Sequence, residues 1–570
     1  MNKQRIVAGL ASVAMASTLV ACSGGSNSDA KTLTVSVNQS LTGQFTPQYA
    51  SSAYDQYVVN LCYESMLKYN ADNELEPVLA KDLPEVSEDG LTLTYKLEKG
   101  HKFSDGTEVT SKDVKFTFAT LADPSYAGPN GGGLENLVGY KEYNSGAAKE
   151  LTGVETPDDY TVVFHLVSPQ IDAVSAFGVM GITSADHYSK YKQGKVKVVE
   201  KNQEESCGSG AYQIKSYDKA SGASFVRNEE FKPEKGQYQV DRIVMKKTDV
   251  TTEVSELKKG TVDLIPDVIE TNKVSEASQD KNMAFNDYTR SAIGFVAMNA
   301  NNGATADKAV RQALMYATDR QGFCDSYFGW DKKASDEVKK VKGGYVPAAY
   351  WNPASESFGA VVRNEEAVDG LNTYAFDMDK ANQVLDEAGW VRGADGIREK
   401  DGQKLEIKFL LSENNSVLDF LIPMVKKTWG DLGVDLKQTT VDFSTLLSNI
   451  QDTSHDSEWN MCFLATSFTS NQDSSANDSY ANDPENMAVN NYSRINDQAL
   501  VDQLTKARAD SDEKQSKADY AEAMKMAADD AGYMPVYSGM QFNLYNKKVD
   551  LTGTGTLRNW SQSMDTITVK

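Results

Sequence analysis

Strand-like and helix-like segments alternate along this chain, and the alternation limits its fold more than any other feature. Segments 405–411 and 434–441 are predicted strands that flank a predicted helix at 418–432. Two strands joined through a helix pair in parallel, because antiparallel neighbours need only a tight turn. Other strand patterns lie at 31–38, 92–97, 160–166, 242–246 and 534–537, and helical patterns lie at 306–318, 378–388 and 497–531. The chain is therefore predicted to have an α/β architecture.

The length of the chain requires more than one hydrophobic core. It has 570 residues, whereas a typical domain has about 100–200, so roughly three to four units are expected. Its composition, with 40% hydrophobic and 24% charged residues, excludes a collagen, a coiled coil and a disordered chain. The polar stretch 469–486 is predicted to be a long surface loop.

The net charge excludes one large class of partners. The chain has 58 Lys and Arg residues against 81 Asp and Glu residues, which gives a formal charge of −23. A surface this acidic repels phosphates, so nucleic-acid binding is not expected. It also repels anionic lipid headgroups, so membrane attachment would require a specific anchor.

The N-terminal segment has the pattern of a cleaved export signal. Lys3 and Arg5 form a short basic region, and 6–21 form an apolar or small run of 16 residues. This run is shorter than the ~20 residues that a membrane-spanning helix needs. It ends in Leu-Val-Ala-Cys at 19–22, which resembles the bacterial lipobox, the motif in which the cysteine receives a lipid.

Three expectations follow for this segment. We predict a signal peptide at 1–21, a lipid anchor on Cys22, and a flexible Gly/Ser/Asn-rich tether at 22–30. The protein would then be exported and held on the outer face of the bacterial cytoplasmic membrane. An ordinary secretory cleavage site beside a chance cysteine is the alternative.

Four further cysteines leave their own redox state open. They are Cys62, Cys207, Cys324 and Cys462, with spacings of 145, 117 and 138 residues that match no zinc motif. Export permits disulfides, and four cysteines allow three connectivities. Buried free thiols are the other possibility, because Cys62 and Cys462 lie in apolar runs.

Catalytic and metal-binding motifs are absent from the sequence. None of the four histidines, His101, His165, His187 and His455, has a histidine partner four residues away. Zinc-protease, nucleophile-elbow, P-loop and dinucleotide-binding motifs do not occur either. We therefore expect no enzymatic activity, no metal and no cofactor. A pair of glycosidase carboxylates among the 81 acidic residues stays open.

Short motifs follow one another in a recognisable order along the mature chain. The first block comprises 63–67 (YESML), 75–80 (LEPVLA), 87–92 (SEDGLT), 103–107 (FSDGT) and 109–114 (VTSKDV). Later blocks are 153–155, 158–162 (DDYTV), 208–212 (GSGAY), 310–314, 317–320, 388–390, 491–492 and 535–537. The succession resembles family 5 of the solute-binding proteins of ABC transporters, which includes oligopeptide-, dipeptide- and nickel-binding receptors.

The resemblance implies a type II periplasmic-binding fold, a two-lobed "Venus flytrap" with an extra outer domain. The lobe I core would consist of 30–67, 208–285 and 538–570, the outer domain of 68–207, and lobe II of 286–537. Two crossing strands would form the hinge. The ligand would be enclosed between the lobes, and a membrane permease would recognise the closed form.

The resemblance also points to candidate ligand-binding residues in lobe II. In peptide-binding members, an Asp shortly after a Gly-Trp pair binds the peptide α-ammonium group. The matching stretch here lacks the Gly-Trp pair and contains Thr466, Ser467, Phe468 and Thr469. Asp473 is the candidate for the anchoring role, and a solvated loop aspartate is the alternative. No arginine lies between Arg398 and Arg494, which argues against a carboxylate clamp from this stretch.

Lobe I would contribute residues just after its first strand. Ser40, Thr42, Gln44 and Phe45 are expected to face the cleft, and the alternative for them is an ordinary loop. Asn299, at the end of the predicted strand 294–298, is a further candidate.

The predicted function is that of a lipid-anchored, monomeric receptor that binds extracellular peptides and delivers them to an ABC permease. The same fold binding a non-peptide solute, such as a metal chelate or a sugar, or a signalling peptide is the first alternative. A secreted hydrolase is the remote one.

Overall fold

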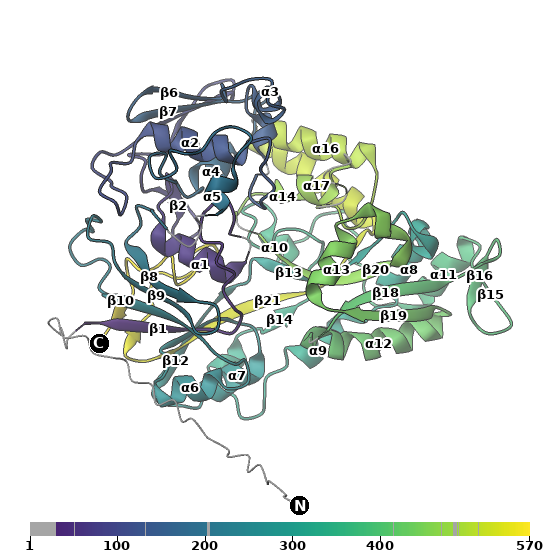
Figure 1. Ribbon diagram of the computed structural model, residues 1–570. Helices are drawn as coiled ribbons and strands as arrows, with labels where there is room; N and C mark the ends of the chain where they lie inside the picture. The colour runs from purple at the N-terminus through teal and green to yellow at the C-terminus, as the bar shows by residue number, and fades with distance from the viewer. Residues whose placement is uncertain are drawn as a thin grey trace, which may run out of the picture.

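Three groups of strands form the framework of the protein (Figure 1). The computed structural model describes residues 30–50, 52–131, 133–201, 206–413, 415–468, 470–482, 487, 490–510 and 512–570. The predicted signal peptide, Cys22, the tether up to residue 29 and Thr469 lie outside the described residues. Among the helices of the described part, none has the length and apolar character needed to cross a membrane.

The first group of strands is the centre of what we call lobe I. Its order is β11-β1-β10-β9-β8, with bounds Leu264–Val268, Thr32–Val37, Arg242–Lys247, Gly222–Arg227 and Tyr212–Asp218. Strand β1 runs parallel to β10 and β11, and β9 and β8 extend the sheet in antiparallel pairing. Its helices are α1 (Ala53–Cys62), α6 (Glu253–Lys259) and α7 (Thr271–Ala277). The alternating apolar residues Leu33, Val35 and Val37 of β1 are buried in the core under α1.

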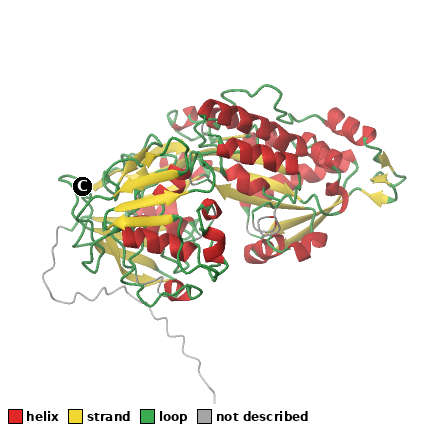
Figure 2. Ribbon diagram, turned by 90° about the horizontal axis from the view of Figure 1, so that it is seen from above, coloured by secondary structure: helices red, strands yellow, loops and turns green. Residues whose placement is uncertain are grey.

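The second group of strands is the centre of what we call lobe II. Its order is β19-β18-β20-β13, with bounds Asp435–Val441, Glu406–Ser412, Met461–Ser467 and Ala292–Met298. The helices around it are α8 (Lys308–Tyr316), α9 (Arg320–Tyr327), α10 (Gly359–Val362), α11 (Met378–Glu387), α12 (Ser416–Leu432), α13 (Phe443–Ile450), α14 (Ser475–Tyr480), α16 (Gln498–Ala509) and α17 (Glu513–Asp530). Figure 2 shows these helices on both sides of the strands. A small separate sheet contains β15 (Val391–Arg392), β16 (Arg398–Lys400) and β17 (Gln403–Lys404).

The third group of strands lies above α1 in Figure 1 and forms what we call the outer region. Its order is β4-β5-β7-β6, with bounds Glu85–Val86, Thr92–Lys96, Thr161–His165 and Val154–Asp158. It contains α2 (Ser111–Leu121), α3 (Tyr140–Asn144), α4 (Ala173–Gly178) and α5 (Lys197–Glu200). Two hairpin-like pairs complete the description, β2 (Leu67–Tyr69) with β3 (Leu75–Pro77) and β22 (Val549–Asp550) with β23 (Thr568–Val569).

Two chain segments cross between lobe I and lobe II. The first is β12 (Met283–Thr289), which leads directly into β13. The second is β21 (Tyr533–Asn546), a strand of 14 residues. Its first part pairs with β13 in lobe II, and its second part pairs with β11 and β12 in lobe I. The short strand β14 (Gly344–Tyr345) pairs with the middle of β21. One continuous strand therefore connects the two sheets.

Several predicted elements are confirmed and one is wrong in part. Strands β18 and β19 pair in parallel through α12, as the strand–helix–strand pattern indicates. The stretch predicted as a surface loop at 469–486 contains α14 and the buried Ala476 and Tyr480. These two apolar side chains pack into the lobe II core, and the polar residues around them concealed that role. Cys62, Cys207, Cys324 and Cys462 are buried free thiols, so no disulfide joins them.

Close packing where β13 meets β21 gives the first testable prediction. A Cβ added at Gly294 would lie 2.1 Å from Cε1 of Tyr537, its partner across the strands. The exposed Gly430, in α12, has no atom within 4 Å of such a Cβ. We expect Gly294→Ala to destabilise the protein by about 1–3 kcal/mol through overpacking. Gly430→Ala, the matched control, should stabilise it by about 0.5–1 kcal/mol, because alanine is the better helix former. Urea unfolding midpoints measure both effects, and equal midpoints for the two variants would contradict the packing.

Candidate functional site

The carboxyl ends of the parallel strands in both lobes point toward the crossing strands. In lobe I, Leu264 of β11 pairs with Tyr545 and Val268 pairs with Phe542, so β11 runs toward the middle of β21. Strands β1 and β10 are parallel to β11 or β1 and run the same way. In lobe II, Ser467 at the carboxyl end of β20 pairs with Ala292 beside the crossing, and β18 and β19 run with β20. Ligands of open α/β sheets bind at the carboxyl ends of such strands.

Backbone and hydroxyl hydrogen bonds join the crossing strands to the end of β20. Ser291 lies between β12 and β13, and its Oγ donates to the Phe468 carbonyl oxygen at 2.7 Å. The Phe468 amide donates back to the Ser291 carbonyl oxygen at 2.8 Å. The next residue on the other side, Arg290, donates its amide hydrogen to the Gly539 carbonyl oxygen at 2.9 Å. These bonds fix the position of the segment that follows β20 relative to the crossing.

A cavity of about 570 Å³ lies between lobe I, the outer region and this segment of lobe II. Phe468, Ser470 and Ser474 line it from lobe II. Lobe I and the outer region supply mainly neutral polar side chains, together with the charged Glu64, Lys68 and Asp172. The neutral polar residues are Gln56, Asn60, Asn130, Ser175, Asn559, Ser561 and Gln562. Its size lies within the range of small-molecule binding pockets, ≈ 300–1,000 Å³.

A smaller cavity of about 190 Å³ lies at the carboxyl ends of β1 and β11. Asp267 is its most unusual residue. The hydroxyl groups of Tyr57 and Tyr288 both donate to the Asp267 carboxylate. Asp267 also has a φ of +58°, a left-handed conformation that is uncommon for residues other than glycine and is found preferentially at functional sites. Burial raises the pKa of the Asp267 carboxyl, while the two tyrosine hydroxyls and the charge of Arg290 act in the opposite direction.

The Arg290 side chain is a cationic group without a fixed hydrogen-bonding partner at its tip. Its Nη1 is buried and has no hydrogen-bond acceptor among the residues that the structure describes. Its guanidinium carbon lies 5.5 Å from the centre of the Tyr537 ring, within cation–π range. A buried guanidinium nitrogen that lacks an acceptor carries a desolvation cost of about 1–3 kcal/mol or more. An anionic ligand group would remove that cost.

The predicted lobe II residues fall on both sides of the cavity wall. Phe468 lines the large cavity, the half-buried Thr466 and the exposed Ser467 end β20, and Thr469 lies outside the described residues. Asp473 is buried, with 7% of its surface exposed, and its Oδ1 accepts a hydrogen bond of 2.6 Å from Trp351 Nε1. It is not among the residues that line the large cavity, although its neighbour Ser474 is. Its role as an ammonium ligand stays a prediction.

The predicted lobe I residues surround the entrance to α1, and Asn299 lies elsewhere. Thr42 Oγ1 donates to Asp55 Oδ2 at 2.8 Å, and Phe45 is buried edge-on against Tyr217 with ring centres 4.9 Å apart. Ser40 is exposed, Gln44 is half-buried, and none of these four residues lines the two cavities. Asn299 is fully buried at the end of β13 away from the crossing, where its amide donates to the carbonyl oxygens of Asp456 and Trp459. Their ligand-binding roles stay predictions.

Two sheets whose strand ends face each other across crossing strands define a two-lobed ligand-binding protein, and known proteins share this arrangement. The chain is 24% identical to the oligopeptide-binding protein AppA of Bacillus subtilis over 413 residues, which cover 71% of this chain and 68% of AppA. The solved structure of AppA from Bacillus subtilis in complex with a nonapeptide is similar with a TM-score of 0.76 at 20% identity, covering 95% of this chain and 99% of that chain.

Two further solved structures extend the comparison. Lactococcal OppA, complexed with an endogenous peptide in the closed conformation, has a TM-score of 0.77 at 18% identity and covers 95% of this chain and 100% of its own. NikZ from Campylobacter jejuni, in complex with Ni(L-His), has a TM-score of 0.73 at 20% identity and covers 92% of this chain and 96% of its own. The fold is that of the type II periplasmic binding proteins, as the sequence resemblance indicates.

Residues 74–488 match the family model of the bacterial extracellular solute-binding proteins, family 5. The chain belongs to this family, whose members are the substrate-binding receptors of ABC importers. The compared relatives are binding proteins rather than enzymes.

The environment of Asp473 gives the second testable prediction. Burial raises the pKa of its carboxyl from 3.8 to about 6, against the opposing hydrogen bonds from Ser355 and Trp351. Between these two pH values the folded protein binds the proton more tightly than the unfolded chain, so the free energy of unfolding falls as the pH rises through this window. Asp473→Asn removes this loss. Relative to the wild type, its stability should be higher at pH 7 than at pH 4 by up to about 3 kcal/mol.

Urea unfolding at pH 4, 5 and 7 measures the effect. The exposed Asp72→Asn is the control and should leave the difference between the pH values unchanged. If Asp473→Asn lost as much stability between pH 4 and pH 7 as the wild type, the assignment of the raised pKa to this carboxyl would be wrong.

Proposed function

We propose that this protein is the lipid-anchored receptor of an ABC importer that captures extracellular peptides between its two lobes and delivers them to the permease. Family membership gives the receptor class. Support for a peptide ligand comes from the relatives, which include an oligopeptide-binding protein and a dipeptide-binding protein, and from the neutral polar lining of the large cavity. Neutral hydrogen-bonding groups suit a peptide backbone, and water-filled pockets tolerate different side chains.

The observation that carries this proposal furthest is the unpartnered Nη1 of Arg290 at the crossing strands. In the proposed function, this guanidinium binds the C-terminal carboxylate of the peptide. The adjacent carbonyl and amide of Ser291 hold Phe468, which lines the large cavity, so the arginine and the cavity belong to one continuous region. A guanidinium binds a carboxylate with charge-assisted, often bidentate, hydrogen bonds.

Closure would couple ligand binding to recognition by the permease. Lobe II already contacts the outer region through Arg508, whose Nε and Nη2 each lie 3.2 Å from the Asp172 carboxylate oxygens. The Tyr69 hydroxyl also donates to Asn471 Oδ1 at 3.2 Å. Ligand contacts that both lobes make exist only when the lobes are close, so the ligand favours the closed population by the free energy of those contacts. The proposed division is a lobe I core of 30–67, 208–285 and 538–570, an outer domain of 68–207, and lobe II of 286–537.

The location and assembly are part of the proposal. The lipobox-like residues 19–22 support export and lipidation of Cys22, which would hold a monomeric receptor on the outer face of the cytoplasmic membrane. A net charge of −23 would not by itself keep the protein on an anionic bilayer, so the acyl chains would supply the attachment.

A second candidate function is the binding of a non-peptide solute that carries a carboxylate. The burial of Asp473 against Trp351 favours it, because the carboxylate expected to bind a peptide ammonium group is not at the cavity surface. The related NikZ structure contains Ni(L-His) and a further structural neighbour contains agropinic acid, so the fold accepts such ligands. Arg290 would serve either ligand class.

The third testable prediction separates these candidates. Arg290→Gln should weaken the binding of synthetic peptides of three to nine residues by about 2–5 kcal/mol, because the ligand carboxylate loses its charged partner. C-terminally amidated peptides should bind the wild type more weakly and should be nearly insensitive to the substitution. Isothermal titration calorimetry measures both.

The exposed Arg242 of β10 gives the matched control, since Arg242→Gln removes one positive charge from the same lobe away from the crossing. If both forms of the peptides bound Arg290→Gln as tightly as the wild type, the carboxylate anchor would be wrong. If no peptide bound the folded wild type at all, the peptide ligand would be wrong, and the second candidate would be favoured.

A further inference from the structure

A cluster of possible metal ligands lies outside the region between the lobes. Asp105, His187 and Cys207 each offer one donor atom, and these three atoms all lie within 4.8 Å of one another. None of the three residues lines the 570 Å³ cavity. They come from sequence positions 82 and 20 residues apart, and for this reason no metal-binding motif is visible in the sequence.

Local structure holds each of the three residues in place. Asp105 lies in an Asp-Gly turn, where its Oδ1 accepts hydrogen bonds from the Thr107 amide at 3.0 Å and the Thr107 hydroxyl at 2.6 Å. The turn is joined to the segment of Cys207 because the Ser104 amide donates to the Gly208 carbonyl oxygen at 3.0 Å. The residues are therefore brought together by the backbone and not by the chance placement of mobile side chains.

His187 supplies the second observation that points to a ligand. Its backbone amide donates to Ser184 Oγ at 3.1 Å, and its ring stands edge-on to Tyr188 with ring centres 4.7 Å apart. Its Nε2 is buried and has no hydrogen-bond partner among the described residues. A buried polar nitrogen without a partner is costly, and coordination of a metal ion would satisfy it.

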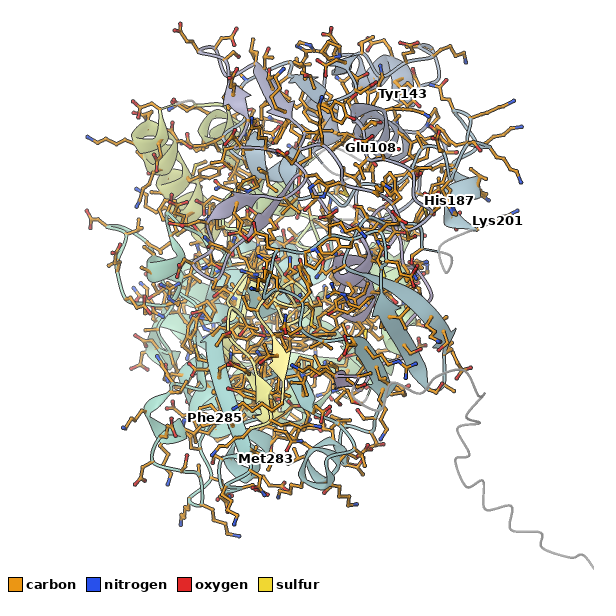
Figure 3. All side chains as sticks on the ribbon, turned by 90° about the vertical axis from the view of Figure 1, so that its left-hand side faces the viewer. Glu108, Tyr143, His187, Lys201, Met283 and Phe285 are labelled. Carbon is orange, nitrogen blue, oxygen red and sulfur yellow. The ribbon has the colours of Figure 1, made fainter. Side chains whose placement is uncertain are left out.

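The cluster is open to the exterior through a hollow of about 510 Å³. The three residues line this hollow together with Ser104, Ser206 and the segment 214–217 of β8. Figure 3 places His187 in the upper half of the molecule with Glu108 and Tyr143, whereas Met283 and Phe285 of β12 lie at the lower end. An ion would thus reach the cluster without passing between the lobes, and the hollow has room for a water molecule as a further ligand.

We propose that Asp105, His187 and Cys207 form a zinc-binding site with a fourth position occupied by water. One carboxylate oxygen, one imidazole nitrogen and one thiolate are the donor types that Zn²⁺ uses, and three protein ligands with one open position are a common zinc arrangement. The thiolate and imidazole disfavour Mg²⁺ and Ca²⁺, which prefer oxygen ligands. A bound ion would tie the turn of the outer region and the loop of His187 to the segment that returns to β8. This site does not depend on the identity of the transported ligand.

Zinc titration of the full-length protein against a chromophoric competing chelator tests the site. We expect one Zn²⁺ per chain. His187→Gln and Cys207→Ser should each weaken binding at least about tenfold, since even residues that only support zinc ligands cost 10–100-fold. Cys324→Ser and His165→Gln are matched controls, because Cys324 is a buried free thiol of the lobe II core and His165 lies in β7 of the outer region. They should bind zinc as the wild type does.

Cobalt substitution provides a readout that a non-specific acidic surface would not give. Co²⁺ bound to a thiolate gives a sulfur-to-metal absorption band, which we expect in the wild type and in Cys324→Ser but not in Cys207→Ser. Circular dichroism establishes that each variant folds, and the less buried His187→Gln keeps the test valid if Cys207→Ser does not fold. Absence of stoichiometric zinc binding, or unchanged binding in His187→Gln, would overturn the proposal.

Discussion

The pairing of β21 with both sheets is the interaction on which the rest of the structure depends. Its residues from Tyr533 to Tyr537 hydrogen-bond with β13, and those from Met540 to Asn546 hydrogen-bond with β12 and β11. A strand shared in this way fixes the register of both sheets, because a slip of one residue would move every side chain to the opposite face. It also directs the carboxyl ends of the parallel strands in both lobes toward the same crossing. The ligand region is a consequence of this topology.

The same topology explains why charged groups accumulate at the crossing. Asp267 ends β11 in a left-handed conformation and accepts hydrogen bonds from Tyr57 and Tyr288. Arg290 follows β12 and keeps a buried guanidinium nitrogen without an acceptor among the described residues. The carboxylate is satisfied by protein groups, whereas that nitrogen is not. This asymmetry is the physical basis for assigning the anionic end of the ligand to the arginine.

Hydrophobic patterns predicted the regular elements well, because those patterns are local. The strand–helix–strand unit of β18, α12 and β19 is an example, and the alternation of Leu33, Val35 and Val37 in β1 is another. The candidate site was less predictable. Asp473 is buried because Trp351, 122 residues away, donates to it, and no local pattern records such a partner. The unpaired nitrogen of Arg290 is likewise invisible in the sequence, since it depends on what surrounds the side chain after folding. A polar loop sequence also concealed the buried Tyr480.

The central claim is that the space between the lobes holds peptides through their common backbone and carboxylate. Mass spectrometry of the protein purified without denaturation tests this most directly, by comparing its native mass with its mass after unfolding and by sequencing what is released. The account predicts a heterogeneous set of peptides with free C-terminal carboxylates. A single defined non-peptide compound in one-to-one amount would contradict it.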